Sequence, residues 1–219
     1  IHFRNGGVSI ICADTIDITG DLNINGISYE CADYVMFRNY FLRGIAAFMG
    51  HVDGSIAASD VDKNGLALTM ADLVILYRIM IGVGAYPPMP SHSPNVTHVQ
   101  HNPVTGQIAF ETKDTLGAVY LEFTGTCTNV TVDSALRDQL SWNVRDGITS
   151  VLLAPQDCTG FDSILSGSHL TIAPPLLLQK AEVSTYDGKI VTTIIDEPSG
   201  VDESENIPIP SEFALHQNY

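Results

Sequence analysis

The chain is short of positive charge. It has ten Lys and Arg against twenty-five Asp and Glu, a formal net charge of −15 over 219 residues. Proteins that bind nucleic acid neutralise phosphates with Lys and Arg, so the composition argues against nucleic-acid binding. It disfavours an anionic membrane surface for the same reason. The acidic balance fits cation binding and solubility outside cells.

Long apolar runs and catalytic motifs are also missing. The most apolar helix candidate, residues 73–81, is interrupted by Arg78 and is far shorter than the roughly 20 residues of a membrane span. No nucleophile elbow, zincin helix, phosphate loop or dinucleotide fingerprint occurs, so we expect no enzyme activity. The first residues do not resemble a signal peptide, and we expect a mature processed chain or a fragment.

The four cysteines form no Cys-x-x-Cys pair, which argues against a zinc site. Their positions favour two local disulfides, Cys12 with Cys31 and Cys127 with Cys158. Disulfides persist in oxidising compartments, so we expect a secreted protein, extracellular or on the cell surface. The alternative is four buried thiols that pack as small apolar residues.

Two stretches of the sequence repeat the same pattern of oxygen-bearing side chains. Asp-Leu-Asn-Ile-Asn-Gly begins at Asp21, and Asp-Val-Asp-Lys-Asn-Gly begins at Asp60. Each is followed by a further aspartate, Asp33 or Asp72, and then by an apolar run, residues 34–42 or 73–81. Oxygen ligands at alternate positions and a glycine at the sixth are what a calcium-binding loop requires. The repeat therefore predicts two Ca²⁺ sites.

Each predicted loop is one residue longer than the usual twelve. The twelfth positions are Ala32 and Ala71, which offer no side-chain ligand, so the closing aspartates come one residue later. The predicted ligands are Asp21, Asn23, Asn25, the Ile27 carbonyl and Asp33 in one loop, and Asp60, Asp62, Asn64, the Leu66 carbonyl and Asp72 in the other. With three carboxylates against two, the second loop is predicted to bind more tightly. The alternative is a pair of Asx-rich turns that only cap two helices.

These residues resemble a dockerin over residues 14–84. The resemblance lies in the two loops and in the Ala-Asp plus apolar helix that follows each of them. Dockerins are paired half-EF-hand loop–helix modules that bind calcium and dock onto cohesin domains. The resemblance therefore implies Ca²⁺ and a protein partner. The chain departs from the family in the extra loop residue and the longer gap between repeats.

In the second half of the chain, the sequence pattern predicts short strands with no helices between them. The expected strands are 107–111, 118–123, 140–144, 149–154, 169–172, 176–186 and 189–195, with Asp187-Gly188 as a two-residue hairpin turn. Their layout is similar to cohesin-type sandwiches over most of 96–195. The last nine residues, 211–219, resemble the start of the C-terminal sorting tails of type IX secretion, which implies export.

We therefore predict a multidomain fold, a small α EF-hand-like loop–helix pair plus an all-β sandwich. The predicted parts are a β segment at 1–13, the loop–helix repeats at 14–84, a proline-rich linker at 85–95, the sandwich at 96–195 and an acidic, extended tail at 196–219. Asn95 and Asn129 begin glycosylation sequons, and simple polar loop residues are the alternative there.

Both predicted helices look apolar nearly all round, which requires cover on more than one side. They either pack on each other and on the β domain, or expose a docking face for another molecule.

The leading hypothesis is a non-catalytic, calcium-binding structural subunit of an extracellular filament or scaffold, with copies of itself as partners. It would assemble through the two modules or by strand addition. The alternative is the C-terminal anchoring module of a larger extracellular polysaccharide-degrading enzyme.

Overall fold

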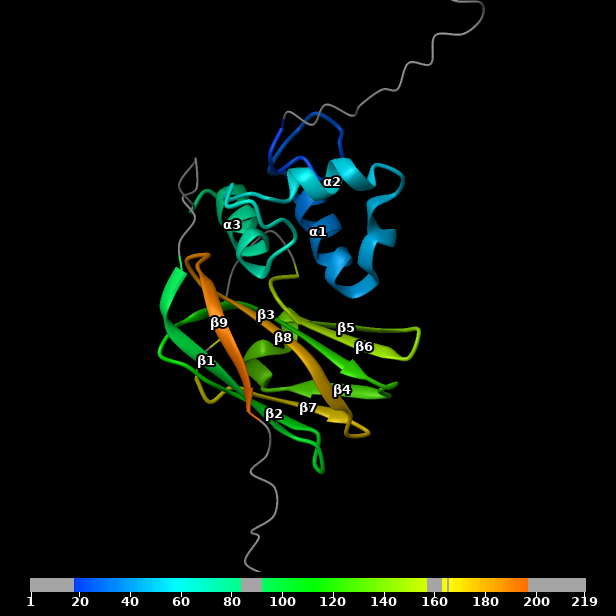
Figure 1. Ribbon diagram of the computed structural model, residues 1–219, viewed down its shortest axis with the longest axis vertical. Helices are drawn as coiled ribbons and strands as arrows, with labels where there is room; N and C mark the ends of the chain where they lie inside the picture. Colours follow the sequence, from blue (N-terminus) through cyan, green and yellow to red (C-terminus); the bar gives the residue numbers. More distant parts are fainter. Residues whose placement is uncertain (1–17, 84–91, 157–162, 165, 197–219) are drawn as a thin grey trace, which may run out of the picture.

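The computed structural model describes residues 18–83, 92–156, 163–164 and 166–196. It has two parts, which Figure 1 shows one above the other. We call residues 18–83 the helical module and residues 92–196 the sandwich. The predicted β segment at 1–13 and almost all of the predicted tail lie outside the described residues.

The helical module contains both predicted helices. Its elements are α1 (Cys31–Arg43), the 3-10 helix η1 (Gly44–Phe48), α2 (Val52–Ala58) and α3 (Met70–Met80). α1 and α3 each begin three residues earlier than predicted, at a capping box whose third helical residue is the closing aspartate. α2 and η1 fill the longer gap between the repeats and were not predicted.

The two helices differ in how they are covered. In α3 every residue from Met70 to Tyr77 is buried, so this helix is covered on all sides as predicted. In α1 the buried apolar residues are Tyr34, Phe37 and Phe41, spaced as one stripe along one side. Val35 is 39% exposed, but Met36, Tyr40 and Leu42 are partly buried against the same cluster, so α1 is also covered on more than one side, as predicted.

The sandwich is built from one nine-stranded sheet. Its strands are β1 (His92–Asn102), β2 (Gln107–Glu111), β3 (Leu116–Thr124), β4 (Asn129–Val132), β5 (Leu140–Arg145), β6 (Ile148–Leu153), β7 (His169–Ala173), β8 (Leu177–Thr185) and β9 (Ile190–Asp196). Their order is β4-β7-β2-β1-β9-β8-β3-β6-β5, antiparallel except for the parallel pair β1 and β9. The sheet folds over into two layers, with β5, β6, β3 and β8 beside the helices (Figure 1).

All seven predicted strands are present, with ends that differ by at most two residues. β1 and β4 were not predicted, and the 3-10 helix η2 (Ser134–Gln139) lies between β4 and β5, where no helix was expected. β1 begins at His92, so the last residues of the predicted linker lie in a strand.

Two strands of the sheet are buried on both faces. In β3, Val119, Leu121 and Phe123 belong to the core inside the sandwich, whereas Ala118 and Tyr120 belong to the apolar cluster of the helical module. β6 divides in the same way between these two clusters. Side chains alternate between the faces of a strand, so a strand with both faces buried reads as a continuous apolar run.

Cys127 is a free thiol in the core of the sandwich, 4% exposed, so the predicted Cys127–Cys158 bridge is wrong. It packs there as a small apolar residue. Cys31 is disulfide-bonded. Cys12 and Cys158 lie outside the described residues, and the pairing of Cys12 with Cys31 stays a prediction.

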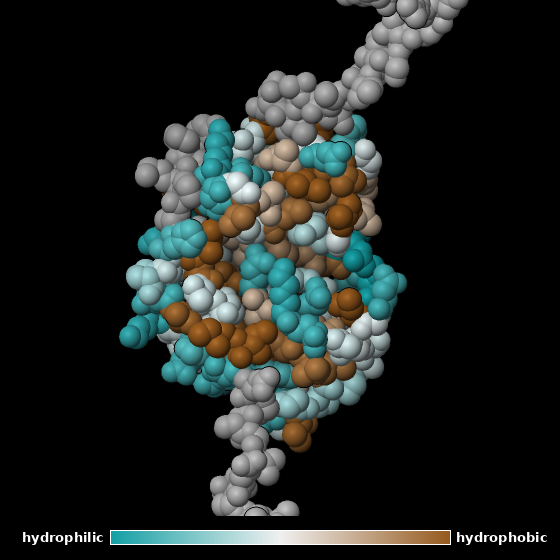
Figure 2. Space-filling view, in the orientation of Figure 1, coloured by the Kyte–Doolittle hydropathy of each residue, from teal (hydrophilic) through white to brown (hydrophobic). Residues whose placement is uncertain are grey.

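Among the described residues, no helix combines the length and apolar character needed to cross a membrane. Figure 2 shows hydrophobic and hydrophilic residues interleaved on the visible surface, with hydrophobic areas on both parts of the molecule. In the helical module the apolar side chains that reach solvent include Met49, 89% exposed, and Ile45.

Candidate functional site

The two oxygen-rich loops share one backbone arrangement. In residues 21–33, which we call loop one, Asp21 accepts hydrogen bonds from the N–H of Asn25 at 3.0 Å and of Gly26 at 2.8 Å. In residues 60–72, loop two, Asp60 accepts from the two residues in the matching places, both at 3.0 Å. Gly26 and Gly65 have φ of +89° and +85°, a conformation that glycine adopts without strain. The repeat in the sequence is therefore a repeat in structure.

The closing aspartate of each loop ties the start of the loop to the start of a helix. Asp33 accepts from the N–H of Asn23 and of Glu30, both at 3.1 Å. Asp72 accepts from the N–H of Val61 at 2.8 Å and from that of the α3 N-cap, Thr69, at 3.2 Å. Both aspartates therefore cap a helix, as the alternative of Asx-rich capping turns expects. The side chains of Asp60 and Asp62 accept hydrogen bonds within loop two and are not part of the α3 cap.

Loop two gathers three carboxylates into a small volume. Asp60, Asp62 and Asp72 each offer an oxygen, and these oxygens lie within 4.8 Å of one another. Asp62 and Asp72 are 1% and 0% exposed, and no ion pair among the described residues involves any of the three. Buried carboxylates without a positive partner are costly, and an all-oxygen donor set suits Ca²⁺. These residues fit a calcium ion.

In both loops the side-chain oxygen of the fifth residue accepts a hydrogen bond from the backbone N–H of the seventh residue and so stabilises a turn. Asn25 accepts from the N–H of Ile27 at 2.8 Å, and Asn64 from that of Leu66 at 2.6 Å. The side chains of Ile27 and Leu66 are 60% and 57% exposed and point to solvent, so only the backbone of these residues could contribute to the site. Their carbonyls stay predicted ligands.

Glu30 is a site residue that the sequence reasoning missed. Its carboxylate accepts from the side-chain amides of Asn23 at 2.7 Å and Asn25 at 2.5 Å. Its position directly before α1, three residues ahead of Asp33, is the signal that could have pointed to it. With Glu30, loop one also has three carboxylates. The predicted tighter binding by loop two therefore rests on the close spacing of its carboxylates rather than on their number.

Burial changes the acidity of the closing aspartates. It raises the pKa of Asp33 from 3.8 to about 6, with the nearby charges of Asp21 and Glu30 acting in the same direction. Burial also raises the pKa of Asp72 from 3.8 to about 7, assisted by the charge of Asp62. Their backbone hydrogen bonds oppose this rise without cancelling it. Keeping these buried carboxylates ionised therefore costs free energy, and a bound cation would remove that cost.

In calcium-free buffer we expect the helical module to lose stability as pH rises from 3.8 to about 7. The folded chain keeps protons on Asp33 and Asp72 that the unfolded chain has already released, so this contribution is complete below 3.8 and lost above the folded pKa. Melting temperatures across this range, read from helical circular dichroism, measure it. The double variant Asp33→Asn/Asp72→Asn is the control and should flatten the profile. An equally steep profile in the control would contradict the assignment.

The helical module covers one face of the sandwich. We call the side of β8, β3, β6 and β5 that meets the helices the docking face. Its apolar centre is Ala118, Tyr120, Leu152 and Ala154, all at most 7% exposed and all in one cluster with the helices. α3 contacts β3 and β8, and α1 contacts β5 and β6. Of the two predicted alternatives for the apolar helices, packing on the β domain is therefore confirmed.

Polar side chains of the sandwich bind the ends of both helices. Glu182 in β8 accepts from the N–H of Met70, the first residue of α3, at 2.7 Å. Asn143 in β5 donates to the carbonyl of Leu42 at 3.0 Å, and Arg145 donates to the carbonyl of Arg43, both in the last turn of α1. A carboxylate at a helix N-terminus and donors at a C-terminus satisfy free backbone groups and complement the helix dipole. These hydrogen bonds fix the orientation of α1 and α3 on the sheet, in addition to the apolar packing between them.

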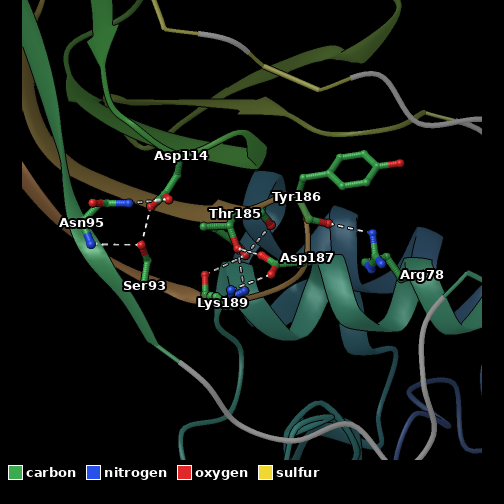
Figure 3. A network of polar contacts seen from close by, with 9 residues as sticks. Arg78, Ser93, Asn95, Asp114, Thr185, Tyr186, Asp187 and Lys189 are labelled. Atoms are coloured by element: carbon green, nitrogen blue, oxygen red, sulfur yellow. Dashed lines mark hydrogen bonds and ion pairs between the residues drawn. The ribbon is translucent and has the colours of Figure 1, made fainter.

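The turn between β8 and β9 forms another part of the contact (Figure 3). Arg78 of α3 donates to the carbonyl of Tyr186 at 3.0 Å and lies over its ring. Gly188 has the expected positive φ, +82°, but the connection between β8 and β9 is four residues long, 186–189, and not two as predicted. A Cβ at Gly188 would lie 2.4 Å from Ile75 Cγ1. Asp187, held by Thr185 and Lys189, fixes the turn (Figure 3). The glycine is needed both for the turn and for close approach of α3.

The two predicted glycosylation sites differ in accessibility. Asn95 donates its side-chain amide to Asp114 at 2.8 Å (Figure 3), and Thr97 of the same sequon is fully buried. Asn129 and Thr131 are both exposed at the edge strand β4. The structure therefore disfavours a glycan on Asn95 and leaves Asn129 accessible.

No family model matches the chain, and no curated protein matches its sequence. Among solved structures it is similar to a non-cellulosomal cohesin from the hyperthermophilic archaeon Archaeoglobus fulgidus, at 16% identity and a TM-score of 0.25, over 47% of this chain and 86% of that one. It is also similar to a type I cohesin–dockerin complex from Clostridium thermocellum, at 10% identity and a TM-score of 0.32, over 48% of this chain and 91% of that one.

Proposed function

We propose that this chain is a non-catalytic structural protein, secreted and calcium-binding, that assembles with copies of itself into an extracellular or cell-surface filament or scaffold. The observation that supports this most is the contact at the docking face. It joins a helical module to a sheet through an apolar cluster and through hydrogen bonds to helix ends. Such a contact is suited to specific attachment between protein surfaces.

Calcium has a defined place in this proposal. The two helices that meet the docking face, α1 and α3, are the two that begin at the closing aspartates of the loops. An ion in each loop would neutralise buried carboxylates and hold the first helical turn. In α1 that turn contains Tyr34, whose hydroxyl donates to the carbonyl of Pro155 in the sandwich at 2.7 Å. In α3 it begins with Met70, bound to Glu182. We therefore assign calcium the role of keeping the contact surface in shape.

We expect the full chain, concentrated in calcium, to form filaments or discrete oligomers and to return to single chains when a chelator is added. Removing the ions leaves the buried aspartates uncompensated and loosens the helices that make the contact. Negative-stain electron microscopy and light scattering, with and without chelator, measure this. Magnesium at equal concentration is the control for ionic strength, because it demands a tighter octahedral site. Single chains in calcium at every concentration would contradict the proposal.

A further inference from the structure

We propose that a cavity between the end of α1 and the sheet binds one ring of a neutral sugar, either free or at the end of a glycan. The cavity lies on the docking face, beside its apolar centre, and none of the predicted calcium ligands line it. The proposal goes beyond the proposed function and does not depend on assembly.

The sheet contributes a row of polar side chains to the cavity. Glu122 of β3 lies opposite Ser150 of β6 on one side and opposite Lys180 of β8 on the other. All three line the cavity, which has a volume of about 200 Å³. Tyr120, two residues before Glu122 on the same face of β3, donates its hydroxyl to that carboxylate at 2.9 Å. This wall therefore offers a carboxylate, hydroxyls and an ammonium group side by side.

The helical module contributes a hydroxyl from the opposite wall. Tyr40, in the last turn of α1, lines the cavity, and its ring is stacked on that of Phe48 with centroids 5.5 Å apart. Burial raises the pKa of Tyr40, and the charges of Lys180 and Glu122 act on it in opposite directions, so its hydroxyl lies close to the polar row. Among the described residues this hydroxyl has no hydrogen-bond partner. It is held in place and free to bind a ligand.

The cavity opens to solvent at the turn between β5 and β6. Asp146 and Ile148 line it there, and their side chains are exposed, that of Asp146 by 88%. Tyr120 and Ser150 are buried and form its deep end. A sugar can therefore enter at this turn, and a longer glycan can leave its remaining units outside.

The charges that line the cavity balance one another. Two carboxylates, Glu122 and Asp146, stand against two cations, Arg145 and Lys180. Arg145 lies 3.6 Å from Asp146, and Lys180 lies 3.1 Å from Glu182, just outside the lining. A charged ligand would upset this balance. A neutral ligand with several hydroxyls can donate to the carboxylates and accept from the cations, and hydrogen bonds to charged groups are the stronger kind.

Size and apolar surface narrow the ligand further. Sites for drug-sized molecules measure roughly 300–1,000 Å³, so this cavity takes a smaller molecule, on the scale of one sugar ring. Three aromatic side chains line it, Tyr40, Phe41 and Tyr120. Their rings offer apolar surface to the carbons of a sugar, while the polar row meets its hydroxyls.

A sugar in this cavity would touch both parts of the molecule, Tyr40 on the helical module and Glu122 on the sheet. It would therefore bind only while the module covers the docking face, and it would stabilise that form by mass action. At ten times the dissociation constant of the sugar, hydrogen exchange that requires the module to separate from the sheet should slow about tenfold.

The test titrates the isotope-labelled full chain, in calcium, with three neutral probes: methyl β-glucoside, methyl α-mannoside and methyl β-galactoside. Chemical shifts in nuclear magnetic resonance spectra measure binding. We expect at least one probe to saturate with a dissociation constant on the order of 1 mM and to shift Glu122, Ser150 and Lys180. The anionic methyl β-glucuronide should bind at least tenfold more weakly than the best neutral probe.

Two variants and a matched control place the sugar. Tyr40→Phe keeps the stacked ring and removes only the free hydroxyl, so we expect at least fivefold weaker binding. Ile148→Trp changes an exposed side chain at the opening and should block entry, with no saturable binding left. Tyr34→Phe removes a tyrosine hydroxyl of α1 outside the cavity and should leave the affinity unchanged within twofold.

No saturable binding of any neutral probe would overturn the proposal, because the cavity then holds water only. Binding that both Tyr40→Phe and Ile148→Trp leave unchanged would overturn it equally, since the sugar would lie elsewhere. Tighter binding of the glucuronide than of every neutral probe would overturn the assignment to a neutral ligand. None of these results decides whether the chain assembles in calcium, so the proposed function stands or falls separately.

Discussion

Asp72→Ala is expected to lower the free energy of unfolding of the helical module by about 4 kcal/mol in saturating calcium. The side chain closes loop two and forms the capping box of α3 with Thr69. Loss of the cap accounts for about 1 kcal/mol. Loss of an ion present at 100 times its dissociation constant accounts for about 2.7 kcal/mol. Urea unfolding followed by the helical circular dichroism signal measures the sum.

Chelator separates the two contributions. Without calcium, Asp72→Ala loses the cap, about 1 kcal/mol, but also removes an uncompensated buried carboxylate, so the difference from wild type should be at most about 1 kcal/mol. Asp53→Ala removes an exposed aspartate of α2 and is the matched control, with an expected change within about 0.5 kcal/mol in either buffer. An equal loss from Asp72→Ala with and without calcium would show that Asp72 is a helix cap and no ligand.

Tyr34→Ala is expected to cost about 4 kcal/mol, because it empties a large, fully buried site. The ring lies 4.9 Å from that of Tyr77, and the hydroxyl donates to the carbonyl of Pro155 across the contact between module and sandwich. Its removal therefore weakens the core of the module and the docking contact together. Thermal and urea unfolding of the full chain measure the loss.

Tyr34→Phe isolates the contact with the sandwich. It keeps the ring and removes only the hydroxyl, so we expect about 1 kcal/mol from the lost hydrogen bond. The carbonyl of Pro155 is then left unpaired. If Tyr34→Ala costs less than about 1 kcal/mol, the helical module is not packed on the sandwich as described.

The local elements of this fold could be predicted well from the sequence. The repeat starting at Asp21 and Asp60 predicts two equivalent loops because oxygen spacing and a glycine turn act within a dozen residues. The turn at Asp187-Gly188 is likewise a short-range signal, and Gly188 has the positive φ expected of it. β1 was missed because its first residues carry the proline and polar residues of a linker.

What the sequence could not show is how distant elements meet. Glu182 binds α3 from 112 residues away, and Asn143 binds α1 from 101 residues away. No local pattern contains such pairs. One signal was available: Leu116–Leu121 of β3 and Val151–Leu153 of β6 are runs without a polar side chain apart from the Tyr120 hydroxyl, which indicates strands covered on both faces. Cys127 shows that composition alone can mislead: the even cysteine count suggested a disulfide, but the structure has a buried free thiol there.

We propose that both loops bind calcium and thereby hold α1 and α3 in the form that meets the docking face. Isothermal titration of the calcium-free full chain measures this binding. We expect two ions per chain, one lost in Asp21→Ala and the other, tighter one lost in Asp60→Ala, with hydrogen exchange at the docking face slowing as the ions bind. Absence of saturable calcium binding, or binding that leaves hydrogen exchange at the docking face unchanged, would contradict it.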